Sequence, residues 1–428
     1  MFEILHSLGL SNFMSTPISG TDLVLIGFAY VDDSDLFAFS TSADRDSTAT
    51  KMQKIIDSWQ QSAKVTGGAI APEKCWWYML DFEWDNNCDW QYVKLDSPHQ
   101  YTMFVNDSND NRRALQYVDP FTAKEMLGVH LSPDGSSDEQ VRQLKNKAIK
   151  AADIIRTTNV YPSEAWIALT TMAQKSLEYC LPATTLSENN CKEVMRPLLT
   201  SFLPKAKINR NIKQDVLYSD YQSQGLGLKS LYWSQGIYHV VEIIEHIWKR
   251  STTGHFMQMS MEYLRLQIGT NDSFFQLNIK KFQALIDSNT WLTNTWEFMS
   301  KFNITTEINP TTIPLQREND IPIMSAILNK NILNVKELQI VNKCRIYLKA
   351  FLLSDITSGN GKTISHNAWN GYNNNTSPQH SPHKWPQISC PSKNMWKVWR
   401  SALHQVFCRQ SKQKLDTPLS KWYINPSG

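Results

Sequence analysis

The sequence FAYVDDSDL, residues Phe28–Leu36, places two adjacent carboxylates between two apolar runs. Residues 23–30 before them and 36–39 after them are rich in the aliphatic and aromatic types that favour strands. A polar tetrad between two such runs predicts a β-hairpin with Asp32 and Asp33 at its tip. Neighbouring carboxylates suit Mg²⁺, which prefers oxygen ligands, and two such ions about 3.5–4 Å apart support phosphoryl transfer. The alternative is a purely structural turn, because aspartate is common in turns.

Hydropathy and cysteine content argue against a membrane-spanning protein and against a secreted protein held together by disulfides. The chain has 428 residues, enough for two or three domains with their own cores. It has no run of about 18 apolar residues, so no membrane-spanning segment is expected. The N-terminus carries Glu3 and His6 and lacks the basic region of a secretory signal. Seven cysteines, an odd number without a CxxC pair, argue against a disulfide framework. We therefore expect an intracellular protein of the nucleus or cytoplasm, without a membrane partner.

Charge is unevenly distributed along the chain. The total is only +3, but residues 1–140 hold 9 Lys and Arg against 21 Asp and Glu. The remaining residues hold 34 basic against 19 acidic side chains. Such asymmetry indicates an acidic, metal-collecting part followed by a basic part that meets a polyanion, although drift in surface composition is the alternative.

Three motifs in order resemble the reverse transcriptases of non-LTR (LINE-type) retrotransposons. Tyr30-Val31-Asp32-Asp33 is similar to the aromatic-x-Asp-Asp signature of their catalytic hairpin. A helix expected over 45–64, the Gly67-Gly68 turn and a short strand leading to Lys74 resemble the segment that follows it. Lys124–Leu131, which contains Leu127-Gly128-Val129, resembles the primer-grip strand, where this tripeptide forms a tight hairpin. The resemblance is specific over residues 23–131 and looser to about residue 240.

The resemblance implies an α+β fold and an RNA-directed DNA polymerase ancestry. The fold would be a partial polymerase palm, an antiparallel sheet with helices, over residues 1–135. A helical thumb and connection would follow over 136–300. Asp32 and Asp33 would bind Mg²⁺, and Lys74 would be a general acid near the incoming deoxynucleotide. Contacts to an RNA template/DNA primer duplex are expected from Tyr30, Met126, Leu127, Gly128 and Val129.

One element of that family's active site has no match. A polymerase palm takes another metal-binding aspartate from a strand well upstream of the catalytic hairpin. Only 31 residues precede Asp32, and the one aspartate among them is Asp22, at the start of the hairpin strand itself. We therefore expect an N-terminally truncated copy, or one with a misassigned start. Such a chain would lack the fingers and bind Mg²⁺ weakly or not at all.

The basic two thirds of the chain is expected to be mostly helical. Apolar residues recur at helical spacing over 141–158, 163–180 and 189–202, with a last such helix over 395–407. Residues 301–428 would form a C-terminal helical region with a flexible loop near 358–391, rich in Asn, Ser, Gly, Pro and His. The densest basic cluster offers phosphate contacts and consists of Lys205, Lys207, Arg210 and Lys213.

Two other functions stay open at this point. The chain could be a non-catalytic nucleic-acid-binding protein that uses the basic thumb and tail. It could also be a protein scaffold without a nucleic-acid role, which would be favoured if the four basic residues were scattered over different faces.

Overall fold

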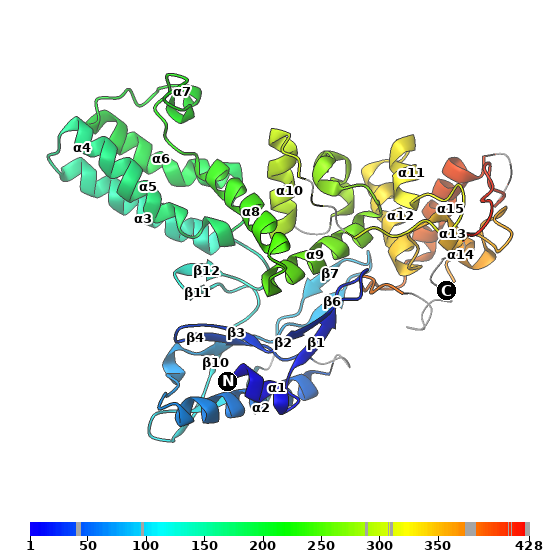
Figure 1. The fold of residues 1–428 in the computed structure, drawn as a ribbon, viewed down its shortest axis with the longest axis horizontal. Coiled ribbons are helices and arrows are strands. Elements are labelled where there is room, and N and C mark those ends of the chain that lie inside the picture. Colours follow the sequence, from blue (N-terminus) through cyan, green and yellow to red (C-terminus); the bar gives the residue numbers. More distant parts are fainter. Residues whose placement is uncertain are drawn as a thin grey trace.

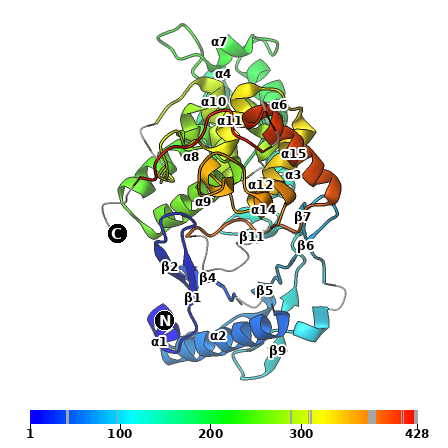
Figure 2. The same ribbon diagram turned by 90° about the vertical axis from the view of Figure 1, so that its right-hand side faces the viewer.

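The computed structural model describes residues 1–39, 44–95, 98–286, 290–306, 308, 311–372, 382–409, 411 and 413–423. It is a mixed α+β structure, as expected (Figure 1). A strand-rich part forms the lower half of the molecule in Figures 1 and 2, and helices form the upper half. No described helix is both long enough and apolar enough to cross a bilayer.

The described strands all lie within the first 131 residues and pair only two by two. The antiparallel pairs are β1 (Asn12–Ser15) with β2 (Asp22–Leu25), β3 (Gly27–Tyr30) with β4 (Asp33–Leu36), β6 (Phe82–Trp84) with β7 (Trp90–Tyr92), β8 (Phe104–Asn106) with β9 (Arg112–Ala114), and β11 (Lys124–Met126) with β12 (Val129–Leu131). β5 (Trp76–Trp77) and β10 (Gln116–Tyr117) pair in parallel. These strands therefore form small hairpins and one parallel pair, not one continuous sheet.

The apolar run 23–30, expected to be one strand, divides at Ile26 into β2 and β3. Residues 11–20 are rich in polar side chains and include Pro17, which predicts a loop, but they contain β1, which pairs with β2. The side chain of Asn12 explains this arrangement, because it joins both hairpins. Its amide donates to the carbonyls of Leu25 and Phe37 at 2.9 and 2.7 Å, and its oxygen accepts from the amide of Phe39 at 2.8 Å.

Helix α2 (Arg45–Val65) organises the strand-rich part, and its residues 45–64 were predicted correctly. Ile55 packs with Ile26 and with Leu5 of α1 (Phe2–Ser7), whereas its neighbour Ile56 packs in a second core with Trp77 and others. Short 3-10 turns complete this part: η1 (Pro72–Lys74) and η2 (Pro98–Tyr101). The single helix thus supports two separate groups of hairpins.

A helical arm follows, shown in green at the upper left of Figure 1. It consists of α3 (Asp138–Thr157), α4 (Pro162–Ile167), the π-helical turn η3 (Ala168–Ala173), α5 (Gln174–Glu178), η4 (Leu181–Ala183), α6 (Glu188–Lys205) and α7 (Gln214–Tyr218). The expected stripe on α3 is buried at Leu144, Ala148 and Ile155, in a shared core with Val194 and Leu198 of α6. Helix α8 (Leu231–Trp248) leads from the arm to the C-terminal helices.

The C-terminal helices share one core that extends from Ile243 to Leu419 and so crosses the boundary expected at residue 300. They are α9 (Thr252–Ile268), α10 (Trp291–Phe302), α11 (Ile323–Lys330), α12 (Val335–Tyr347), α13 (Leu353–Ile356), α14 (His366–Asn370) and α15 (Lys393–Phe407), with turns η5 (Phe274–Gln276), η6 (Ile279–Lys281) and η7 (Gln283–Leu285). Residues 373–381 of the expected loop near 358–391 lie outside the described residues. Its described part contains α14, where Trp369 is buried and the Ala368 carbonyl accepts a 2.9 Å hydrogen bond from Trp399.

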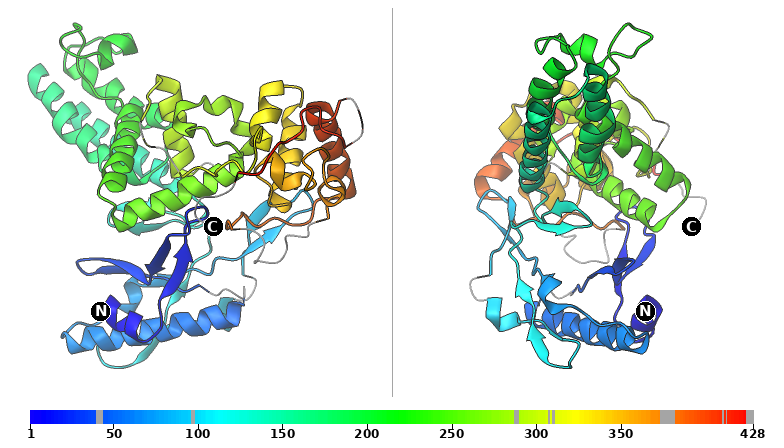
Figure 3. Two further views of the ribbon diagram at one scale, coloured as in Figure 1. Left: turned by 45° about the vertical axis from the view of Figure 1, so that its right-hand side comes forward. Right: turned by 90° about the vertical axis from the view of Figure 1, so that its left-hand side faces the viewer.

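Two hairpin turns connect the strand-rich part to the C-terminal helices (Figure 3). In the β1–β2 turn, the amides of Ile18 and Ser19 donate to the buried carboxylate of Glu262 at 2.7 and 3.0 Å. In the β6–β7 turn, the Asn87 carbonyl and the Asp89 carboxylate accept from the Lys343 ammonium at 2.7 and 2.6 Å. The two parts are therefore joined by specific polar contacts.

Candidate nucleic-acid interface

The predicted hairpin is present as β3–β4, with Asp32 in its turn and Asp33 as the first residue of β4. The second strand was expected over 36–39, but it begins at Asp33 and ends at Leu36. Tyr30 pairs with Asp33, so Val31 and Asp32 form a two-residue turn. All four residues are exposed, Tyr30 to 66% and Val31 to 90% of their surface. The motif therefore presents its aromatic ring and both carboxylates to solvent, where a polar ligand can reach them.

The backbone at this tip is strained. Val31 has φ 57°, in the left-handed region, which costs a β-branched residue about 1–2 kcal/mol. Gly27 permits the close strand pairing behind it, because a Cβ there would lie 2.1 Å from the carbonyl oxygen of Asp35. Strain of this kind is found preferentially at functional sites, and a purely structural turn would favour glycine or asparagine at this position.

Asp35 is a further carboxylate that the sequence argument missed. It lies two residues after Asp33 on β4, so both side chains share one face of the strand. Burial, and secondly the charge of Asp33, raise the pKa of Asp35. The i, i+2 spacing of the two aspartates was the available signal. Burial also raises the pKa of Tyr78 to about 12, and the charges of Asp119 and Asp35 add to this rise.

The donors at the hairpin do not fit a complete two-metal centre. Across the described ranges, no three or more His, Cys, Asp or Glu side chains are grouped so that they could hold a metal ion. Asp32 and Asp33 supply oxygen ligands of the type that Mg²⁺ prefers, but a two-ion site that clamps a phosphoryl group needs more. Weak or absent Mg²⁺ binding therefore stays a prediction.

Lys74 ends the exposed turn η1, immediately before Cys75 and β5. Within the described part of the chain, no hydrogen bond or ion pair joins its ammonium to Asp32 or Asp33. A role as a general acid therefore stays a prediction.

The Leu127-Gly128 turn forms a tight hairpin, as the resemblance implied. Met126 pairs with Val129, and the two residues between them have φ 50° and 78°. Positive φ at both turn positions matches the right-handed twist of the strands. The Tyr179 hydroxyl, at the end of α5, donates to the Leu127 carbonyl at 2.9 Å, and Val129 is buried in the core of the arm. The hairpin is therefore held by the helical arm, and Leu127 is 48% exposed.

The four basic residues are gathered at the far end of the same arm. Lys205 ends α6 and donates to the Thr158 carbonyl at 2.9 Å, and the other three follow on the exposed loop towards α7. Ion pairs occupy many charges in the body of the arm, such as Arg142 with Glu139 and Lys145 with Glu193. In the part that the structure describes, none of Lys205, Lys207, Arg210 and Lys213 forms an ion pair. The tip thus carries positive charge that no carboxylate neutralises directly.

The length of α3 separates the Leu127 hairpin from this basic tip. The His130 amide donates to Gln140 near the start of α3 at 2.7 Å, whereas Thr158 follows its last residue. A helix of 20 residues is about 30 Å long, close to one turn of a nucleic-acid duplex. One duplex could therefore contact both places.

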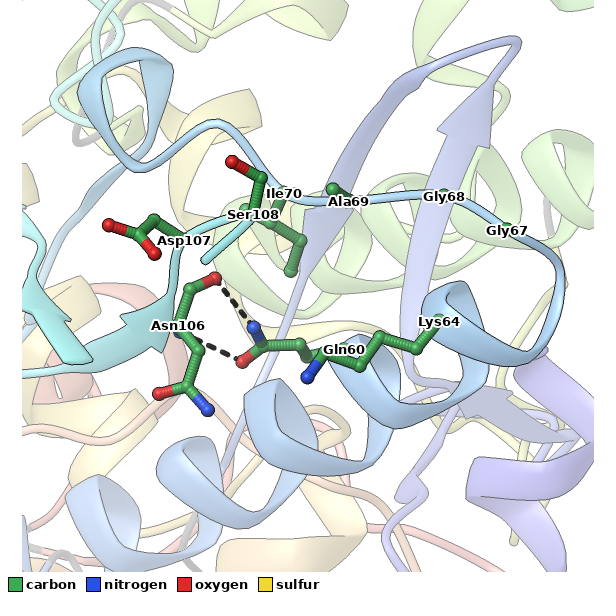
Figure 4. Close-up of a pocket in the computed structure, with 9 residues that line it drawn as sticks. All are labelled: Gln60, Lys64, Gly67, Gly68, Ala69, Ile70, Asn106, Asp107 and Ser108. Atoms are coloured by element: carbon green, nitrogen blue, oxygen red, sulfur yellow. Dashed lines mark hydrogen bonds between the residues drawn. The ribbon is translucent and has the colours of Figure 1, made fainter. Parts of the chain in front are cut away.

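A small pocket lies elsewhere, at the C-terminal end of α2 (Figure 4). It has a volume of about 260 Å³ and lies between the Gly67-Gly68 turn and the β8–β9 loop. Gln60 spans its floor, donating to the carbonyl and accepting from the amide of Asn106. Lys64 and Asp107 line it, but Asp32, Asp33 and Lys74 do not. It therefore does not unite the residues predicted from the sequence.

In comparisons with known proteins, no family model, no curated protein and no solved structure matches this chain.

Proposed function

We propose that this chain is a palm-and-thumb relic of a non-LTR retrotransposon reverse transcriptase that binds a template–primer duplex without extending the primer. The intact ancestor would be an RNA-directed DNA polymerase that uses Mg²⁺ and deoxynucleotides. The observation that carries the proposal is the order of two tight hairpins, with exposed tips at Tyr30–Asp33 and at Leu127-Gly128, followed by a helical arm. The partial palm would be the strand-rich part and the thumb would be the arm.

The chemistry of the exposed groups supports binding to nucleic acid. Lysine and arginine side chains without carboxylate partners can neutralise phosphates, and each phosphate contact makes binding depend more steeply on salt. Tyr30 offers an exposed ring that can stack on a base. The glycine turn at Gly128 allows a close approach of the backbone to a primer end.

If the chain binds a duplex through its basic loop, removing those charges should change how its affinity depends on salt. For an RNA–DNA hybrid duplex, log affinity falls as log salt rises. The magnitude of this negative slope should decrease by about 2.7 when Lys207, Arg210 and Lys213 are all replaced by alanine. Fluorescence anisotropy between low and moderate salt measures it. As a matched control, Lys280, Lys330 and Lys336 are exposed cations of the C-terminal helices, and their replacement by alanine should leave the slope unchanged. An affinity that does not change with salt, or an equal loss in both triple variants, would contradict the proposal.

We expect no primer extension by this chain with Mg²⁺ or Mn²⁺. The reason is the incomplete set of metal ligands around Asp32 and Asp33. A gel-based extension assay with radiolabelled primer should give equal background for the native chain and for Asp32→Ala. Extension that disappears in Asp32→Ala would show that the site is complete in solution.

The main alternative is a nucleic-acid-binding protein without polymerase ancestry. The unpaired basic tip favours it independently of the two hairpins. Anisotropy titrations with two duplexes separate these two functions, one duplex with a recessed primer end and one with blunt ends. If the chain is a palm-and-thumb relic, Tyr30→Ala and Gly128→Val should weaken binding of the recessed end more than binding of the blunt duplex. A nucleic-acid-binding protein without polymerase ancestry has no such requirement.

A further inference from the structure

Helix α8 buries one side and presents large apolar side chains to solvent on the opposite side. One side, which includes Tyr232, Gln235, His239 and Ile243, is buried against the arm and the C-terminal helices. The other side carries five large apolar residues that are exposed: Trp233 to 44%, Ile237 to 54%, Val241 to 42%, Ile244 to 36% and Trp248 to 79%. A surface helix normally has one apolar side, and a helix that is apolar all round normally has a partner on every side.

These five residues, which we name the α8 stripe, form one continuous surface. At 100° per residue they fall within an arc of about 80°, and they extend over about 22 Å of helix. Polar side chains flank the C-terminal half, where Glu242 pairs with His246 and Glu245 pairs with Lys249. In Figure 2, α8 and α9 lie at the outer edge of the upper half of the molecule. The stripe is thus an apolar surface that charged side chains border along one flank.

We propose that a second copy of this chain covers the α8 stripe in an antiparallel α8–α8 dimer. The first argument is area. If a fully free side chain of this size exposes about 200 Å², the five exposed fractions leave about 500 Å² of apolar surface. A stable interface buries about 800 Å² on each partner, of which about 60% is apolar. The stripe supplies about that amount, and an apolar patch of this size is often a binding surface.

The second argument is that the stripe is complementary to itself. A twofold axis beside Val241 sets Trp233 against Trp248 of the second copy and Ile237 against Ile244 of the second copy. Like residues therefore meet like residues at both ends, as an isologous interface requires. Antiparallel pairing also opposes the helix dipoles favourably. Parallel pairing would place Glu245 beside Glu245 and Lys249 beside Lys249, which repel each other.

Sedimentation velocity from 0.5 to about 50 µM tests the proposal. The native chain is expected to sediment as a dimer of twice its 49.3 kDa mass. Val241→Asp places two carboxylates at the axis and should raise the dissociation constant at least tenfold. Val216→Asp is the matched control, since Val216 of α7 is 41% exposed and lies outside the stripe. A monomeric native chain, or a dimer that Val241→Asp leaves intact, would overturn the proposal.

A cross-linking experiment tests the register and does not rely on a charged substitution. In a Cys390→Ser background, which removes the exposed native thiol, Ile237→Cys and Ile244→Cys chains are mixed in equal amounts and oxidised mildly. The mixture should form at least five times more disulfide-linked dimer than either variant alone. Stronger cross-linking within Ile237→Cys alone would indicate parallel pairing and contradict the proposal. A monomer whose stripe tryptophans are quenched only when duplex is added would assign the stripe to nucleic acid.

Discussion

Replacing Arg345 with lysine is expected to lower the free energy of unfolding of the C-terminal core by about 3 kcal/mol. Arg345 is fully buried on α12, and its guanidinium donates to the carbonyls of Leu266, Gln267 and Ala350 at 2.6, 2.9 and 3.2 Å. It also donates from two nitrogens to the side-chain oxygen of Asn342. A lysine ammonium is a single point with three donors and cannot reach all of these acceptors.

These acceptors explain why the residue matters to the fold. Leu266 and Gln267 lie in the last turn of α9, whose final carbonyls have no partner within the helix. The positive charge of Arg345 also interacts favourably with that end of the helix dipole. Burial lowers the pKa of Arg345 to about 9, and the charge of Asp355 acts in the opposite direction. The residue therefore holds the ends of α9 and α12 together.

Urea unfolding followed by tryptophan fluorescence measures this effect, because Trp296 and Trp399 are fully buried in the same core. The control is Arg409→Lys, where the exposed guanidinium donates to the Gln405 carbonyl at 3.0 Å. The control should lose less than about 0.5 kcal/mol. If the two variants lose equal stability, the buried hydrogen bonds of Arg345 do not stabilise the core as argued.

Replacing Glu262 with alanine is expected to cost about 4 kcal/mol and to release the β1–β2 turn from α9. Glu262 has no exposed surface. Its carboxylate accepts from the amides of Ile18 and Ser19 and from the hydroxyls of Ser19 and Thr311, both at 2.7–2.8 Å. The variant would remove the acceptor that these four donors share. Hydrogen exchange at the amides of Ile18 and Ser19 should accelerate, whereas Glu245→Ala, an exposed carboxylate paired with Lys249, should not change it.

The same residue predicts a pH dependence of stability. Burial by itself raises the pKa of Glu262, but the hydrogen bonds from Ser19, Ile18 and Thr311 outweigh burial and hold the pKa below its ordinary value. A carboxyl with a lowered pKa in the folded state stabilises the protein above its unfolded pKa, about 4.3, and this contribution is lost as pH falls further. Glu262→Gln should therefore reduce the acid sensitivity of unfolding below about pH 4. Unchanged acid sensitivity in that variant would mean that the pKa of Glu262 is the same in the folded and unfolded states.

The local elements could be predicted from the sequence because each has its own signal. The helix over 45–64, the existence of the acidic hairpin and the turn at 127–128 depend on periodicity and on the residue types next to each turn. Strand β1 was missed because the hydrogen bonds of the Asn12 side chain join residues 13 to 27 positions apart. No local pattern reports a hydrogen bond at that separation. Asp35 was overlooked in the same way, since its pKa depends on what buries it.

Sequence order alone determined the acidic hairpin, the glycine turn and the basic loop, because neighbouring residues specify turns and helices. Only the tertiary structure decided that the strands pair in separate hairpins. It also decided that Glu262 and Lys343 join the strand-rich part to the C-terminal helices, and that one side of α8 is exposed. These features depend on which distant surfaces pack together, and packing is fixed by shape and by buried polar partners rather than by any short run of residues.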